Sequence, residues 1–334
     1  MITSSNSVET NMKQDLPEAS MARKLITKIR VQKLLISREF WEYRNLYLGV
    51  AIALSSMTCL SYFIFLVIKA WNLTPEQLVD YEDSGAILGE TFYYFLFPTF
   101  WGVAAVSFYH LIRSLYVDRK DSSVLFWRSL PVSDLQVVLS KVTFPLLIGP
   151  AIATVFSYLA YLVYFLGMAL PFMLLRFGVE NLGDFYFEFS DLEMFAEPIY
   201  LAELFPMYIL WSLPTVGWIL FISSWSKKRV FAWAVGLPFL TQFLIYLVCS
   251  IFKMDINIRW LLTNIVLRIT GGIFPGMWVS AQDAKSLHNN IFKFDDIYEV
   301  GKGGLSDPWL WYGVVFSLIL IYLAIRQRRY ADVI

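Results

Sequence analysis

Charged residues are scarce in this chain of 334 residues: they make up 16% of it, against 57% hydrophobic residues. A soluble domain carries about 25% charged and about 45–50% apolar residues, so this composition excludes an ordinary soluble protein. The mean hydropathy is +0.56, and the apolar residues gather in runs long enough to cross a bilayer as helices. The composition therefore predicts an all-α polytopic membrane protein. A net charge of zero gives no reason to expect a nucleic-acid partner.

The residues that catalytic sites need are also missing. The chain has two histidines and no His-Glu-x-x-His or Gly-x-Ser-x-Gly motif, which disfavours an intramembrane hydrolase. It has no Gly-x-x-x-x-Gly-Lys-Ser/Thr motif either, so we do not expect this chain to hydrolyse ATP through such a loop. Cys59 and Cys249 lie within apolar runs and lack ligand spacing, as expected of small buried hydrophobic residues. We predict no catalytic residue, no metal ligand and no cofactor bound by this chain.

The N-terminal region precedes the first apolar run and has two parts. Residues 1–20 are polar and partly acidic, lack the apolar core of a secretory signal, and are predicted to form a disordered cytoplasmic tail. Residues 21–45 interleave cations with apolar and aromatic side chains, which predicts an amphipathic interfacial helix among the lipid headgroups. Such a helix serves as a membrane anchor, or it also contacts a cytoplasmic partner through Arg30, Lys33 and Arg38.

Six apolar runs are long enough to span the membrane, and together they define a transmembrane domain over residues 46–326. They cover residues 46–68, 91–111, 144–170, 199–223, 230–252 and 308–325. Lys and Arg gather in alternate connections, including the loop 113–142, whereas the acidic loops between them hold one cation each. The positive-inside rule then places this loop and both termini, with a C-terminal tail at 327–334, in the cytoplasm.

A further apolar segment lies before the last span, at residues 258–280, and it is broken by charged residues, glycine and proline. Spanning the membrane here would move the C-terminal arginine cluster to the other side. The breakers instead favour a re-entrant extracytoplasmic element over 256–307. They also form a candidate gate of the pathway, made of Gly271, Gly272, Pro275 and Gly276.

Two ionisable residues lie close to the predicted ends of spans. Glu203 is an acid inside the fourth run, where a buried charge is costly and therefore suggests a substrate-facing or gating role. The alternative is an acid near a helix start, where the helix dipole favours it. His110 lies at the end of the second run and is predicted to be an interface residue with water and backbone partners rather than a catalyst.

The cytoplasmic loop contains a structured element between Asp118 and Asp134. Asp118 can cap the start of a short amphipathic helix, and Asp121 lies in its first turn. Pro131 ends this helix, and Ser133 with Gln136 forms a Ser-x-x-Gln capping box for the next one. This pattern predicts a stiff helix–turn–helix. The alternative is a loop that lies on the membrane surface with its apolar residues in lipid.

This stretch resembles the first cytoplasmic loop of ABC-2 type transporter permeases. The similarity rests on an acidic–basic pair, a short apolar helix, a turn of the type Ser/Thr-x-Pro-Val-Ser and a helix that ends in lysine. The matching residues are Asp118-Arg119, Val124-Leu125-Phe126, Ser129-Leu130-Pro131-Val132-Ser133 and Ser140-Lys141. The amphipathic start, the six spans and the broken segment before the last span are also similar, so the resemblance covers nearly the whole chain after residue 21.

The resemblance implies the permease subunit of an ATP-driven exporter in a bacterial cytoplasmic (inner) membrane. Two permease copies, expected to be a homodimer, would each dock a separate ATP-binding subunit, which would hold the ATP and Mg. The docking residues implied in the loop are Asp118, Arg119, Lys120, Asp121, Trp127, Arg128, Ser129, Leu130 and Pro131, with Arg30, Lys33 and Arg38 on the N-terminal helix.

Few charges and many Phe, Tyr and Met residues in the apolar runs favour an amphipathic or hydrophobic cargo over a small ion. The alternative function is a non-transporting membrane anchor or sensor for a cytoplasmic ATPase.

Overall fold

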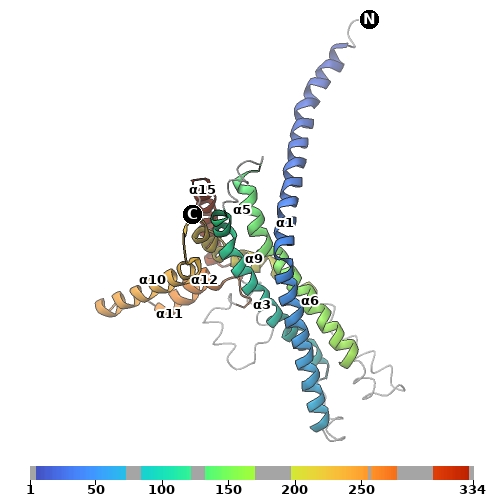
Figure 1. Ribbon diagram of the computed structural model, residues 1–334, viewed down its shortest axis with the longest axis vertical. Helices are drawn as coiled ribbons and strands as arrows, with labels where there is room; N and C mark the ends of the chain where they lie inside the picture. Colours follow the sequence, from blue (N-terminus) through green and yellow to red (C-terminus); the bar gives the residue numbers. More distant parts are fainter. Residues whose placement is uncertain are drawn as a thin grey trace.

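The computed structural model describes residues 5–72, 84–121, 132–169, 197–254, 257–276 and 304–330, which are helical and contain no strand (Figure 1). Among these residues, six helical stretches are long and apolar enough to cross a membrane. The prediction of an all-α, multi-pass membrane protein is confirmed at this level. Predictions for the remaining residues lie outside the part of the chain that the structure describes.

Five of the six spanning stretches are single helices, and the third is joined from four elements. The elements are α1 (Ser5–Asn72), α3 (Ser84–Lys120), α5 (Asp134–Thr143), η1 (Phe144–Ile148), α6 (Gly149–Tyr164), η2 (Phe165–Ala169), α9 (Glu197–Trp225), α10 (Val230–Phe252), α11 (Ile258–Leu261), η5 (Leu262–Leu267), α12 (Arg268–Gly271) and α15 (Pro308–Tyr330). Elements α5, η1, α6 and η2 follow one another without a gap. Pro145 lies at the start of the π-helix η1, and Pro150 lies at the start of α6, directly after it.

Helix α1 differs from the predicted division of the N-terminal region. The tail at 1–20, the interfacial helix at 21–45 and the first span were expected as separate parts, but one helix runs from Ser5 to Asn72. The sequence explains this continuity, because no glycine or proline occurs between Glu18 and Leu48 to end the helix. Figure 1 shows the N-terminal half of α1 extending well beyond the other helices.

The helices pack around two connected apolar regions. On one side, α1, α3 and α6 share a core rich in Phe and Tyr, with Tyr47, Phe95 and Tyr161 fully buried. On the other side, α3 and α5 pack with α9 and α15 around Leu111, Ile219 and other aliphatic residues. Helix α10 exposes most of its apolar side chains, as a lipid-facing helix does.

One end of the bundle gathers several connections, and we call it the loop end. Here α3 ends at Lys120, α5 begins at Asp134, α9 turns into α10 and α15 ends at Tyr330. The segment α11–η5–α12 belongs to the other end, which we call the far end, beside the start of α15. It is not one of the six spanning stretches, and it ends in a turn at Gly272–Gly276, where Gly276 has a φ of 83° that favours glycine.

Candidate functional site

The second helix of the predicted loop motif begins as the sequence indicates. Ser133 Oγ accepts a hydrogen bond from the Gln136 N–H at 3.3 Å, and the Ser133 N–H donates to Gln136 Oε1 at 3.1 Å, so the capping box is confirmed. The Gln136 amide also donates to the Lys28 carbonyl at 3.3 Å, and Val137 packs against Leu35. The start of α5 is therefore held both by its own cap and by α1.

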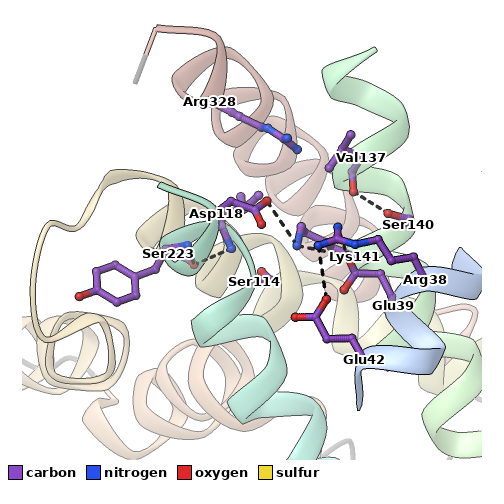
Figure 2. Close-up of polar contacts among 12 residues, drawn as sticks. Arg38, Glu39, Glu42, Ser114, Asp118, Val137, Ser140, Lys141, Ser223 and Arg328 are labelled. Atoms are coloured by element: carbon purple, nitrogen blue, oxygen red, sulfur yellow. Dashed lines mark hydrogen bonds and ion pairs between the residues drawn. The ribbon is translucent and has the colours of Figure 1, made fainter. Parts of the chain in front are cut away.

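Below this cap lies a cluster of buried charged residues, which we call the polar junction: Glu39, His110, Asp118, Arg119 and Lys141. Lys141 Nζ lies 3.2 Å from Glu39 Oε1 and 3.4 Å from Asp118 Oδ2. Figure 2 shows the Lys141 side chain reaching from α5 between Glu39 on α1 and Asp118 on α3. One ammonium group thus joins three helices.

The burial of these groups makes the junction energetically important. Glu39 and Lys141 are 2% and 3% exposed, so each is shielded from water that would otherwise stabilise its charge. Removing one partner of a buried ion pair costs about 3–5 kcal/mol, because the other charge is left without compensation. At the outer edge, the half-exposed Arg38 adds a guanidinium 3.5 Å from Glu42 and 4.0 Å from Glu39.

His110 extends the junction toward the middle of the bundle. Its ring is fully buried, with Nε2 3.2 Å from Glu39 Oε2, and it stacks on Tyr43 at a centroid distance of 4.1 Å. The Tyr47 hydroxyl lies 3.4 Å from Nδ1 and donates to Ser107 Oγ at 3.0 Å. The prediction of water and backbone partners is therefore wrong: side chains of α1 satisfy His110.

A second set of contacts fixes the last turns of α3 to α9. Ser223 Oγ accepts from the N–H groups of Leu115 and Tyr116, at 3.3 and 3.1 Å, and donates to the Ile112 carbonyl at 2.8 Å. The hydroxyl is thus inserted beside the hydrogen-bond ladder of α3. Because the contact uses backbone groups, it holds the path of the helix and not just one side chain.

Two arginines complete the loop end. Arg119 Nη2 donates to the carbonyls of Ser223 and Ser226 at 2.9 and 2.6 Å, so this cation occupies the C-terminal end of α9, where the helix dipole favours it. Arg328, near the end of α15, has Nε 3.6 Å from Asp134 Oδ1. Asp118, Arg119 and Arg328 line one narrow pocket between α3, α9 and α15.

The structure separates the predicted docking residues into two groups. Asp118 and Arg119 are buried and serve as internal contacts, whereas Lys120 and Asp121 are exposed. On α1, the predicted contacts Arg30, Lys33 and Arg38 are all exposed. Trp127, Arg128, Ser129, Leu130 and Pro131 lie outside the described residues.

The predicted gate residues lie at the far end, away from the junction. Glu203 is exposed near the start of α9. Gly271 ends α12, and Gly272 packs against α9, where a Cβ would lie 2.8 Å from Thr215 Oγ1. Pro275 and Gly276 follow in the turn. The described residues contain no group of three or more His, Cys, Asp or Glu side chains placed to hold a metal ion.

Sequence reasoning did not single out Glu39, although its spacing carries a signal. Leu35, Glu39, Tyr43 and Tyr47 recur every four residues and therefore share one helix face, which is the face that α1 turns to α3 and α5. An acid on such a stripe predicts a buried partner.

Comparison of the chain with protein-family models, with curated proteins and with solved structures finds no match.

Proposed function

We propose that this chain is the permease subunit of an ABC-2 type exporter, in which a separate ATP-binding subunit drives export of an amphipathic or hydrophobic cargo. The observation that carries the proposal is the polar junction. Lys141 of α5 pairs with Glu39 of α1 and with Asp118 at the end of α3. From the other side, Arg119 joins the end of α3 to α9, and Arg328 of α15 contacts Asp134 at the start of α5.

A loop that receives a push from a partner must pass it on to the spans without yielding. Lys141 bridges α1 and α3 from α5, so a displacement of the loop moves three helices together. Separating them would expose or unpair buried charges at a cost of about 3–5 kcal/mol. The junction therefore favours rigid-body movement of the loop end over local loosening, which is the behaviour that mechanical coupling needs.

The remaining elements of the proposal follow from the resemblance described above. The ATP and Mg belong to the partner subunit, two copies of which dock on two permease chains, and the complex resides in a bacterial cytoplasmic membrane with both termini inside. Lys120 and Asp121 at the loop, with Arg30, Lys33 and Arg38 on α1, are the exposed described residues that the partner would meet.

The docking test is co-purification of the ATP-binding subunit with the full chain. We expect Arg128→Glu combined with Leu130→Asp to abolish co-purification, because the pair inverts one charge and adds another at the predicted contact. The matched control is Lys227→Glu with Trp225→Asp, which makes the same changes at two exposed positions of the α9–α10 turn. Unchanged co-purification and transport in the loop variant would contradict docking at this loop.

The transport step is tested with the purified complex in liposomes. ATP-dependent movement of a fluorescent lipid or a hydrophobic probe supports export. Sustained ATP hydrolysis without movement of any probe supports the alternative, a membrane anchor or sensor for the ATPase.

A further inference from the structure

At the far end, the guanidinium of Arg268 binds backbone carbonyls in the first turn of α15. Its side chain is 5% exposed, and it donates from Nη1 to the Trp309 carbonyl at 2.6 Å and from Nη2 to the Leu310 carbonyl at 3.0 Å. The guanidinium lies 4.3 Å from the centroid of the Trp211 ring, a cation–π contact with α9. At Gly313 a Cβ would collide with this guanidinium, so glycine there leaves the space that Arg268 needs.

The backbone around Arg268 is fixed to α9. Thr215 Oγ1 donates to the Arg268 carbonyl at 2.5 Å and accepts from the Gly272 N–H at 2.9 Å. The Tyr208 hydroxyl donates to the Ile273 carbonyl at 3.0 Å. Burial lowers the pKa of Arg268 to about 10, opposed by the nearby Asp307, so the side chain stays charged at neutral pH. Segment α12 is thus held by α9 through hydroxyl groups and by α15 through one arginine.

The opposite end of α15 is held by Arg328. Arg328 lies 18 residues after Leu310, about 27 Å along the helix axis at 1.5 Å per residue, and contacts Asp134 at the start of α5. No glycine or proline follows Gly313 in this helix to bend it. Midway, a Cβ on Gly217 of α9 would lie 2.9 Å from the Ser317 carbonyl oxygen, so the two backbones approach closely. Helix α15 is a straight connection between the loop end and α12.

We propose that Arg268 is a positioning residue that couples α12 and the turn after it to movement of the loop end through α15. A shift of α15 at Arg328 moves the Trp309 and Leu310 carbonyls, and the guanidinium carries α12 with them. The identification of this movement with opening of an export pathway rests on the proposed function, but the mechanical link itself does not.

The test measures coupling between the two ends of α15 in the full chain alone. A nitroxide label is attached at Ile265→Cys, a 37% exposed position of η5, in a Cys59→Ala, Cys249→Ala background reconstituted in lipid. The loop end is perturbed by Arg328→Gln. We expect this change to alter the label's spectrum when Arg268 is present. With Arg268→Gln the change should be at least about threefold smaller, because the side chain that links α15 to α12 is then removed.

Two further variants separate the link from general loosening. Arg268→Lys retains a charged donor and is expected to recover part of the response. Tyr208→Phe, the matched control, removes only the α9 hydroxyl that donates to the Ile273 carbonyl and is expected to leave the response to Arg328→Gln unchanged. If Arg268→Gln does not fold, Gly313→Ala displaces the guanidinium from its carbonyls and is expected to weaken the response in the same way.

A full response in the Arg268→Gln or Gly313→Ala chain, or no response to Arg328→Gln with Arg268 in place, would overturn the coupling. The experiment contains no ATP-binding subunit. Its failure is therefore distinct from failure of the proposed function, which would appear as absent co-purification with an intact spectral response.

Discussion

The loop end and the far end both hold a buried cation, but they satisfy it in different ways. Lys141 is paired with two carboxylates that come from α1 and α3, whereas Arg268 donates to two backbone carbonyls of α15. Loss of the first cation removes the ammonium that two buried carboxylates share, whereas loss of the second affects only neutral acceptors. The comparison teaches that the loop end resists separation more strongly than the far end does.

The largest effect is expected at Lys141. Substitution by Met removes the ammonium that the buried carboxylates of Glu39 and Asp118 share, which should lower the free energy of unfolding by about 3–5 kcal/mol. Thermal unfolding of the detergent-solubilised chain, followed by size-exclusion chromatography, measures the change. Lys120→Met, at an exposed position two residues after Asp118, is the control and should have little effect. Equal stability of Lys141→Met and the original chain would remove the basis of the comparison.

A smaller effect is expected at Arg268. Substitution by Gln leaves the carbonyls of Trp309 and Leu310 with fewer donors but leaves no buried charge, so the cost should be about 1–3 kcal/mol. The same unfolding measurement applies. A loss as large as that of Lys141→Met would show that the two ends do not differ in the way described.

His110 tests how far the junction extends into the bundle. His110→Leu removes the contact with Glu39 Oε2 and the stacking on Tyr43 while preserving much of the volume, at an expected cost of about 1–2 kcal/mol. In a double-mutant cycle, combination with Tyr43→Leu should be non-additive by about 0.5–1.5 kcal/mol. Strict additivity would place His110 outside the network.

The smallest effect is expected at the capping box. Gln136→Ala removes the bond to the Ser133 N–H and the bond to the Lys28 carbonyl, both at exposed positions, and should cost about 1 kcal/mol. Gln136→Glu keeps the acceptor for Ser133 but cannot donate to Lys28, so it should retain part of the stability. If both substitutions cost the same, the cap is not what holds the start of α5.

The features that the sequence predicted correctly are local ones. The spans follow from apolar runs, and the Ser133–Gln136 cap follows from a four-residue pattern. The junction could not be found in this way, because His110 and Glu39 are 71 positions apart and their pairing depends on how α1 and α3 pack. The same holds for Arg328, which was read only as one cation of a C-terminal cluster but is buried against α5. In helix α1 the sequence divides the N-terminal region by composition near residue 45, whereas the backbone continues as one helix from Ser5 to Asn72.

The three-helix bridge of Lys141 also has a consequence for biosynthesis. The chain is made from its N-terminus, so the carboxylates of Glu39 and Asp118 leave the ribosome before their shared cation does. Lys141 follows Asp118 by 23 residues, which at about 5–20 residues per second amounts to roughly 1–5 s. During that interval the two acids cannot enter the apolar layer without cost, and they have to wait near its surface. Lys141 supplies the cation that both acids share, so we expect the first three spans to close only after it is made.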